Sequence, residues 1–307
     1  MKFLKLDLTE DATLPFANLS GTILNYEISG TGTPIVFVHS PLLTSEVFFY
    51  QKKQLAQHFQ VITFDIRGHG SSKASESPVS IPLVAEDIRM LLDHVGIEKA
   101  FLCGYSTGGM VVLEALLEHP ERFLGGIVVS GMSELTDVYN KIRAWMACHM
   151  TGSDLLMKLL VKAITNGNAD NASISRQLYE SSQSDTPDNV CTYFQQALSY
   201  TCTNRLGNIQ HPVLLIYGQK DGSFHRYANL LHEGLPHSSL YFFKDAKHQI
   251  PVKSAAKMND LIRLWVESLE ERQTERGLLD LAIARQLNPA MNGEDSVGSV
   301  DRSLGSE

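Results

Sequence analysis

The stretch Gly104-Tyr105-Ser106-Thr107-Gly108-Gly109 decides the fold of this chain. It has the pattern Gly-x-Ser-x-Gly and stands between two apolar runs, Ala100 to Cys103 and Met110 to Leu117. A serine in a tight turn between a strand and a helix lifts its hydroxyl above the sheet, and the flanking glycines remove Cβ atoms that would clash there. We therefore expect Ser106 to be a nucleophile. The amide of Thr107, at the start of the following helix, is expected to stabilise an oxyanion.

Short apolar runs without clean alternation recur on both sides of this turn, as they do in strands that are buried on both faces of a parallel sheet. These runs are Ile35 to Val38, Val61 to Phe64, Ala100 to Cys103, Phe123 to Val129, Val213 to Tyr217 and Leu240 to Phe243. Segments with helical spacing lie between them, including Ser45 to His58 and Leu83 to Val95. The alternation predicts an α/β fold with a mostly parallel sheet and helices on both faces.

The alternation stops between residues 134 and 205, where helical runs occur without a convincing strand. These runs are Tyr139 to Met150, Ser153 to Ile164, Ser173 to Ser182 and Asn189 to Tyr200. We expect residues 1–133 and 206–272 to form the core and residues 134–205 to form an inserted helical cap.

Residues 273–307 are expected to form a C-terminal extension. Its helical run, Leu278 to Leu287, could dock a second copy of the chain in a homodimer. Residues after 288 are rich in Gly, Ser, Asp and Glu and are expected to be largely disordered.

Composition and charge exclude several classes of protein. The chain has 307 residues, of which 43% are hydrophobic and 20% charged, as in ordinary globular proteins. The net charge of -8 disfavours nucleic acid and anionic membrane as partners. No apolar stretch approaches the roughly 20 residues that cross a bilayer, and the N-terminal segment turns acidic at Asp7. We expect a cytoplasmic protein that acts on a small molecule.

The sequence contains no pattern typical of a metal or cofactor site. The four cysteines, Cys103, Cys148, Cys191 and Cys202, lack Cys-x-x-Cys spacing and are expected to be structural thiols in a reducing compartment. No cluster of His, Cys, Asp or Glu has the spacing of metal ligands. The segment Gly30-Thr31-Gly32 precedes a strand, so it predicts a turn and not a dinucleotide-binding loop.

A nucleophilic serine needs a base and an acid that orients the base. In α/β folds with a serine between a strand and a helix, the acid, Asp or Glu, follows the serine in the sequence, and the histidine base follows the acid. Asp221 stands in the loop after the run Val213 to Tyr217, and His248 stands in the loop after the next run. We predict that Asp221 orients His248 and that His248 is the general base. Glu134 and Asp137 remain rivals for the acid.

Four motifs together resemble the α/β-hydrolase superfamily, and within it the capped branch of esterases, lactonases and C–C hydrolases. They are the segment at His39, the segment Asp65-Ile66-Arg67-Gly68-His69-Gly70-Ser71-Ser72, the turn at Ser106, and the loops of Asp221 and His248. The match covers about residues 20 to 270. The resemblance implies a cap that covers the pocket, with apolar cap residues such as Trp145 as candidates to line it. His39 and His69 close strands at the same edge and are expected to support the site without reacting.

One segment departs from the family pattern. Members of the family usually have His-Gly-x after the third strand, where the amide of x is the second oxyanion donor, but this chain has His39-Ser40-Pro41. Proline has no amide hydrogen. Either the loop is shifted so that Leu42 donates, or the oxyanion hole is incomplete and is helped only by Ser40 or a water. Tyr105, next to the nucleophile, is a further candidate for substrate contact.

These features predict a serine hydrolase that needs no cofactor. An ester, lactone or thioester of a small to medium apolar substrate would form an acyl-enzyme on Ser106. Two alternatives remain open at this point: hydrolytic C–C cleavage on the same scaffold, and a ligand receptor that keeps the triad but turns over slowly.

Overall fold

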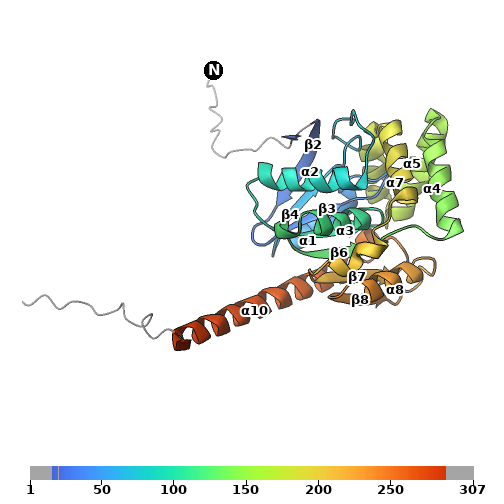
Figure 1. The fold of residues 1–307 in the computed structure, drawn as a ribbon. Helices are drawn as coiled ribbons and strands as arrows, with labels where there is room; N and C mark the ends of the chain where they lie inside the picture. Colours follow the sequence, from blue (N-terminus) through green and yellow to red (C-terminus); the bar gives the residue numbers. More distant parts are fainter. Residues whose placement is uncertain (1–15, 20, 288–307) are drawn as a thin grey trace, which may run out of the picture. The chain divides into compact units, whose positions relative to one another are not determined.

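The computed structural model describes residues 16–19 and 21–287. Within them lies one sheet of eight strands in the order β1-β2-β4-β3-β5-β6-β7-β8 (Figure 1). The strands are β1 (Phe16–Leu19), β2 (Thr22–Ser29), β3 (Pro34–Val38), β4 (Gln60–Phe64), β5 (Ala100–Tyr105), β6 (Phe123–Val129), β7 (Val213–Gly218) and β8 (Ser238–Phe243). Every pairing from β4 to β8 is parallel, which confirms the mostly parallel sheet expected from the sequence.

The first two strands were missed by the sequence analysis. β2 pairs antiparallel with both β1 and β4, so it forms the part of the sheet that is not parallel. In β2 the buried residues Thr22, Leu24 and Tyr26 alternate with more exposed ones. This alternation is typical of antiparallel strands with one face on the core, whereas we searched for continuous apolar runs.

Helices cover both faces of the sheet. They are α1 (Phe49–Leu55), α2 (Ile81–His94), α3 (Gly108–Glu118), α8 (His225–Gly234) and α9 (Ile250–Lys253), and the last described helix is α10 (Ala255–Leu287). Buried residues of α2, α3 and α8 share one apolar cluster with one face of the strands, including Val36 and Val38 of β3. Phe37 lies between these two valines and therefore points to the opposite face, where its ring packs against Phe48 beside α1, with 5.1 Å between ring centroids.

Four helices lie between β6 and β7, in the segment expected to be a cap. They are α4 (Val138–Met150), α5 (Asp154–Asn168), α6 (Ala172–Ser181) and α7 (Pro187–Ser199). Two of these helices have a side-chain N-cap. The Asp137 side chain accepts a hydrogen bond from the Asn140 amide at the start of α4, and the Asn171 side chain accepts one from the Ile174 amide at the start of α6. α4 packs on α7 and α5 packs on α6. These contacts bury one side of each of the four helices.

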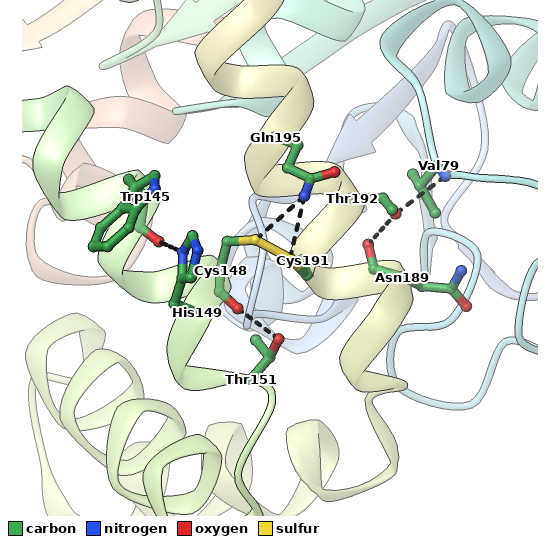
Figure 2. The surroundings of a disulfide bond; sticks show 9 residues. All are labelled: Val79, Trp145, Cys148, His149, Thr151, Asn189, Cys191, Thr192 and Gln195. Atoms are coloured by element: carbon green, nitrogen blue, oxygen red, sulfur yellow. Dashed lines mark hydrogen bonds between the residues drawn. A yellow bond between two sulfur atoms is a disulfide. The ribbon is translucent and has the colours of Figure 1, made fainter.

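A disulfide joins the first and last of these helices, which corrects one sequence-based prediction. Cys148 of α4 is bonded to Cys191 of α7, so these two residues are not the free thiols that we expected (Figure 2). The residues are 43 positions apart and meet only because α4 packs on α7, which no spacing pattern reveals. Cys103 and Cys202 are free and buried, as expected.

Contacts divide the chain into two compact units, Met1–Leu261 and Ile262–Glu307. The sheet and the four helices of residues 138–199 belong to the first unit. The backbone of α10 is helical through Leu287, and the expected disordered residues after 288 lie outside the described part of the chain. None of the described helices is both long and apolar enough to cross a membrane.

Candidate active site

The turn at Ser106 is built as the sequence predicts. β5 ends at Tyr105 and α3 begins at Gly108, so Ser106 lies between a strand and a helix with a φ of 55°. A Cβ at Gly104 would lie 2.2 Å from the Gly108 carbonyl oxygen, and one at Gly108 would lie 2.2 Å from the carbonyl oxygen of Val38. Only glycine fits at either position, because both close contacts are with backbone atoms.

Three polar side chains from three loops meet at this turn. His248 Nε2 lies 3.1 Å from Ser106 Oγ, and His248 Nδ1 lies 2.8 Å from Asp221 Oδ2. A carboxylate can only accept, so Nδ1 carries the imidazole hydrogen and Nε2 is left to accept from the serine hydroxyl. The His248 and Asp221 side chains are 23% and 11% exposed, so the imidazole is partly shielded yet within reach of a substrate.

The rival carboxylates have other partners. The Glu134 carboxylate accepts a hydrogen bond from the Thr201 hydroxyl at 3.4 Å, and the Asp137 side chain caps the start of α4 and accepts a hydrogen bond from the Tyr227 hydroxyl. Of the three candidate acids, the one that bonds His248 is Asp221. Within the described residues, no group of three or more His, Cys, Asp or Glu side chains is arranged to hold a metal ion.

Two further residues hold His248 and were not found from the sequence. The ring of Phe224 lies 4.3 Å from the imidazole between centroids, and Ser130 Oγ donates to the His248 carbonyl oxygen at 3.1 Å. Ser130 directly follows β6 and has a φ of 48°, a strained value for a residue other than glycine. Its place at the end of a parallel strand was the available signal, since sites of such sheets lie at that edge.

The segment expected to supply the second oxyanion donor is a tight turn. The Leu43 amide donates to the Ser40 carbonyl at 3.3 Å, with Pro41 and Leu42 between them. Leu42 is fully buried and has a φ of 61°. Proline in the second position and a positive φ in the third are the marks of a type II turn. The Leu43 amide is thus engaged within the turn, and Pro41 has no amide hydrogen to offer.

The buried His39 side chain is hydrogen-bonded to this turn. Its Nε2 accepts from the Ile66 amide at 2.9 Å, so its Nδ1 carries the hydrogen and donates to the Ser40 carbonyl at 3.0 Å. Complete burial lowers the pKa of His39 despite the opposing effect of Asp65. Burial, with the neighbouring His39, lowers the pKa of His69 to about 3. Both imidazoles are therefore neutral near pH 7 and bond backbone atoms, not Ser106.

Helix α5 contacts the residue before Ser106 through Tyr105, whereas Trp145 of α4 lies on an exposed side of its helix. The Tyr105 hydroxyl donates to Asn168 Oδ1 at 2.9 Å, which ties the last turn of α5 to the residue before the nucleophile. Trp145, which we expected among the residues lining the pocket, is 54% exposed and stacks on His149. The reason is that α4 turns Ala147 and Cys148 inward and leaves Trp145 on its outer side.

Comparisons with known proteins agree with this geometry. A family model described as alpha/beta hydrolase fold matches residues 33–148, which include Ser106. A putative carbamate hydrolase of Azorhizobium caulinodans is 35% identical over 118 residues, or 38% of this chain and 44% of that protein. The match therefore spans less than half the length of this relative.

Solved structures match over a longer part of the chain. An esterase from Exiguobacterium antarcticum has a TM-score of 0.73 and 21% identity, covering 81% of this chain and 97% of the esterase. Est816, described as an N-acyl homoserine lactone degrading enzyme, has a TM-score of 0.68 and 25% identity, covering 81% of this chain and 99% of that protein. With the sheet and the turn at Ser106, these matches show that the chain has the α/β-hydrolase fold.

Proposed function

We propose that this α/β-hydrolase is a serine hydrolase that cleaves carboxylic esters, including cyclic ones, through an acyl-enzyme on Ser106. The observation that carries the proposal is the continuous chain of contacts from Asp221 through His248 to Ser106. Such a chain gives a serine hydroxyl a base near its own proton, which ester hydrolysis requires. The esterase and the lactone-degrading enzyme among the structural neighbours support the same substrate class.

The reaction would proceed in two halves. In the first, His248 Nε2 takes the Ser106 proton as Oγ attacks the carbonyl carbon, and Asp221 stabilises the imidazolium. The tetrahedral intermediate then collapses, and His248 returns the proton to the leaving alcohol. In the second half a water, activated by His248, attacks the acyl-enzyme and releases the acid and the free serine.

Two backbone amides are proposed to bind the oxyanion. One is that of Thr107, at the start of α3, where the helix dipole favours a negative charge. The other is that of Leu42, because Pro41 has no hydrogen and the Leu43 amide is bonded to Ser40. The left-handed φ of Leu42 supports this role, because backbone strain of this kind is concentrated at functional sites.

The surroundings of Leu42 favour an apolar acyl group. Leu42 belongs to a cluster of buried apolar side chains that the cap completes with Met157, Val161 and Val190. A substrate carbonyl held by the Leu42 amide would place its acyl chain near these side chains. We therefore propose a small to medium apolar ester or lactone as the substrate.

A slow-turnover ligand receptor is the second candidate, and Pro41 is the observation that favours it. If the Leu42 amide does not reach the substrate, the oxyanion hole has one protein donor fewer and hydrolysis slows by roughly 10² to 10³. C–C hydrolysis uses the same three side chains and is distinguished only by substrate.

Fluorophosphonate labelling combined with a substrate panel tests the proposal. The wild-type chain and Ser106→Ala would each be treated with the probe and then assayed on esters and lactones of graded acyl length, with a C–C hydrolase substrate included. Rapid labelling of wild type alone, with turnover of esters or lactones, would support a hydrolase. Labelling without turnover on any substrate would favour the receptor, and absence of labelling would overturn the role of Ser106.

A further inference from the structure

Large apolar side chains are exposed on the outer sides of the first two cap helices. On α4 they are Val138, Tyr139, Ile142, Trp145 and Met146. On α5 they are Leu155, Leu156 and Leu159, and the eight side chains are between 41% and 70% exposed. They make up most of the exposed large apolar side chains among the residues whose exposure is described, 16–19, 21–272, 274 and 275. We call this set the cap apolar surface.

The inner sides of α4 and α5 already pack against other parts of the chain. The exposed apolar side chains therefore lie on a second side of each helix. α4 buries Ala147 and Cys148, and the bond from Cys148 to Cys191 holds it on α7. Figure 2 shows the Trp145 indole on the side of α4 away from that bond. α5 buries Met157 and Val161 in the cluster that includes Leu42. The cap apolar surface is thus a second face on helices that are already packed.

The net charge of these two helices is opposite in sign to that of the chain as a whole. Between residues 138 and 168 the charged side chains are Lys141, Arg143, Lys158 and Lys162 against a single Asp154. The chain as a whole carries a net charge of -8. All four basic side chains are exposed, and they stand beside the apolar residues in the sequence of the same helices. A locally basic surface therefore lies on an acidic protein.

We propose that the cap apolar surface docks on an anionic lipid bilayer. Helices that lie in a membrane interface combine a large apolar face with basic side chains, whose long stems let the charges reach the headgroups. Tyrosine and tryptophan are enriched at that depth because their rings are apolar and their polar ends are hydrated. α4 and α5 have 13 and 15 residues, so they would lie along the surface without crossing it.

Charge argues against a second copy of the chain as the occupant. Two copies meeting through this surface would bring the same basic side chains together, and like charges repel. The net charge had disfavoured an anionic membrane, but interactions with a surface are decided by the charges within about a Debye length of it. The enzyme would thereby be placed where apolar esters accumulate.

Vesicle co-sedimentation tests the proposal with the full chain. Vesicles of phosphatidylcholine alone are compared with vesicles of phosphatidylcholine and phosphatidylserine in equal amounts, at low and high salt. We expect at least about tenfold stronger binding to the anionic vesicles at low salt and a loss of that difference at high salt. Lys158→Gln and Lys162→Gln should each weaken binding about fivefold, and Trp145→Gln about tenfold.

Matched controls lie outside the cap. Lys257→Gln removes an exposed charge, and Tyr241→Gln removes an exposed aromatic ring that is 45% exposed, so both should bind as wild type does. Circular dichroism checks that each variant is folded. No binding to anionic vesicles would overturn the proposal, as would equal losses in Lys158→Gln and Lys257→Gln. A dimer seen by light scattering that is lost in Trp145→Gln, without vesicle binding, would assign the surface to a second copy.

Discussion

The turn at Ser106 and the cap apolar surface depart from ordinary folded structure in opposite ways. At the turn of Ser106 the backbone is strained, and the polar side chains have hydrogen-bond partners. The residues other than glycine with positive φ in the described chain are Leu42, Ser106 and Ser130. Ser130 is hydrogen-bonded to His248, and Leu42 is the residue proposed to complete the oxyanion hole. On α4 and α5 the backbone is regular, but apolar side chains face solvent. Strain marks where the chemistry is expected, whereas exposure marks where a partner is expected.

This contrast implies that substitutions at the two regions have different readouts. Changes at the turn should alter rates while leaving the folded state nearly as stable, because the side chains there do little packing. Changes that loosen the cap should alter stability first. The following experiments test this distinction, from the largest expected effect to the smallest.

Ser106→Ala should lower kcat by about 10⁶, because no other group at the turn can form the acyl-enzyme. The free energy of unfolding should change by less than about 1 kcal/mol, since alanine has the same positive-φ strain and the hydroxyl packs little. Steady-state kinetics and urea unfolding of the same samples measure both. Substantial residual activity in a sample free of contaminating hydrolase would exclude Ser106 as the nucleophile.

Asp221→Asn should lower kcat by roughly 10⁴, because the amide favours the wrong imidazole tautomer while keeping the shape of the side chain. Glu134→Gln and Asp137→Asn serve as matched controls, since they change the rival carboxylates in the same way. Kinetics of the three variants on one ester should single out Asp221. A large loss in either control, with Asp221→Asn close to wild type, would move the role of the acid to that residue.

Cys148→Ser should lower the free energy of unfolding by about 3 to 4 kcal/mol under oxidising conditions, because the bond closes a loop between residues 43 apart. Neither sulfur contacts the triad, so kcat should fall far less than in Asp221→Asn. Urea unfolding of wild type and variant, each with and without reductant, makes the comparison. Equal stability of the two proteins without reductant would mean that the bond contributes nothing to the fold.

Asp185→Asn should change how stability depends on pH. Asp185, just before α7, accepts from the Gly70 amide at 2.8 Å, and burial, with Asp65 nearby, raises its pKa to about 8. The unfolded carboxyl titrates near about 3.9, so the folded state holds an extra proton between the two values and stability falls as pH rises from about 4 to 8. Asparagine removes this effect. Between pH 5 and pH 8, the free energy of unfolding measured in urea should rise in the variant by more than about 1 kcal/mol relative to wild type. Parallel plots of this free energy against pH for the two proteins would contradict the raised pKa of Asp185.

Pro41→Gly should leave kcat unchanged or lower it, because the Leu42 amide and not the residue-41 amide is proposed to bind the oxyanion. Glycine also loosens the turn, which works against activity. Steady-state kinetics on the best ester of the panel measure the effect. A tenfold or larger increase would show that position 41 is the one that lacks a donor.

The sequence predicted the parallel part of the sheet and the residues that meet at the turn, because both follow local rules. Continuous apolar runs mark buried parallel strands, and strand ends at one edge place Ser106, Asp221 and His248 together. What it missed depends on distant contacts. The bond from Cys148 to Cys191 needs α4 to pack on α7, and the contact of Phe224 with His248 needs the loops after β7 and β8 to fold toward each other.

The turn at Leu42 also could not be predicted in full from the sequence, because part of it depends on contacts with distant residues. Ser-Pro in a loop predicts a turn, but neither the positive φ of Leu42 nor its burial against Met157 of α5 can be inferred without the cap in place. Trp145 was misplaced for the converse reason. Apolar residues on a cap helix were assumed to face inward, whereas the inner side of α4 is occupied by Asn140, Ala147 and Cys148.

The order of the proposed triad along the chain has a consequence for synthesis on the ribosome. Ser106 is made first, the whole cap follows, and Asp221 and His248 are made only afterwards. β5 and β6 can pair early, but β7 and β8 add to the edge of the sheet last. A nascent chain therefore carries Ser106 without its proposed base until the final strands have emerged, so the proposed ester hydrolysis would begin only after residues 134–205 have been made.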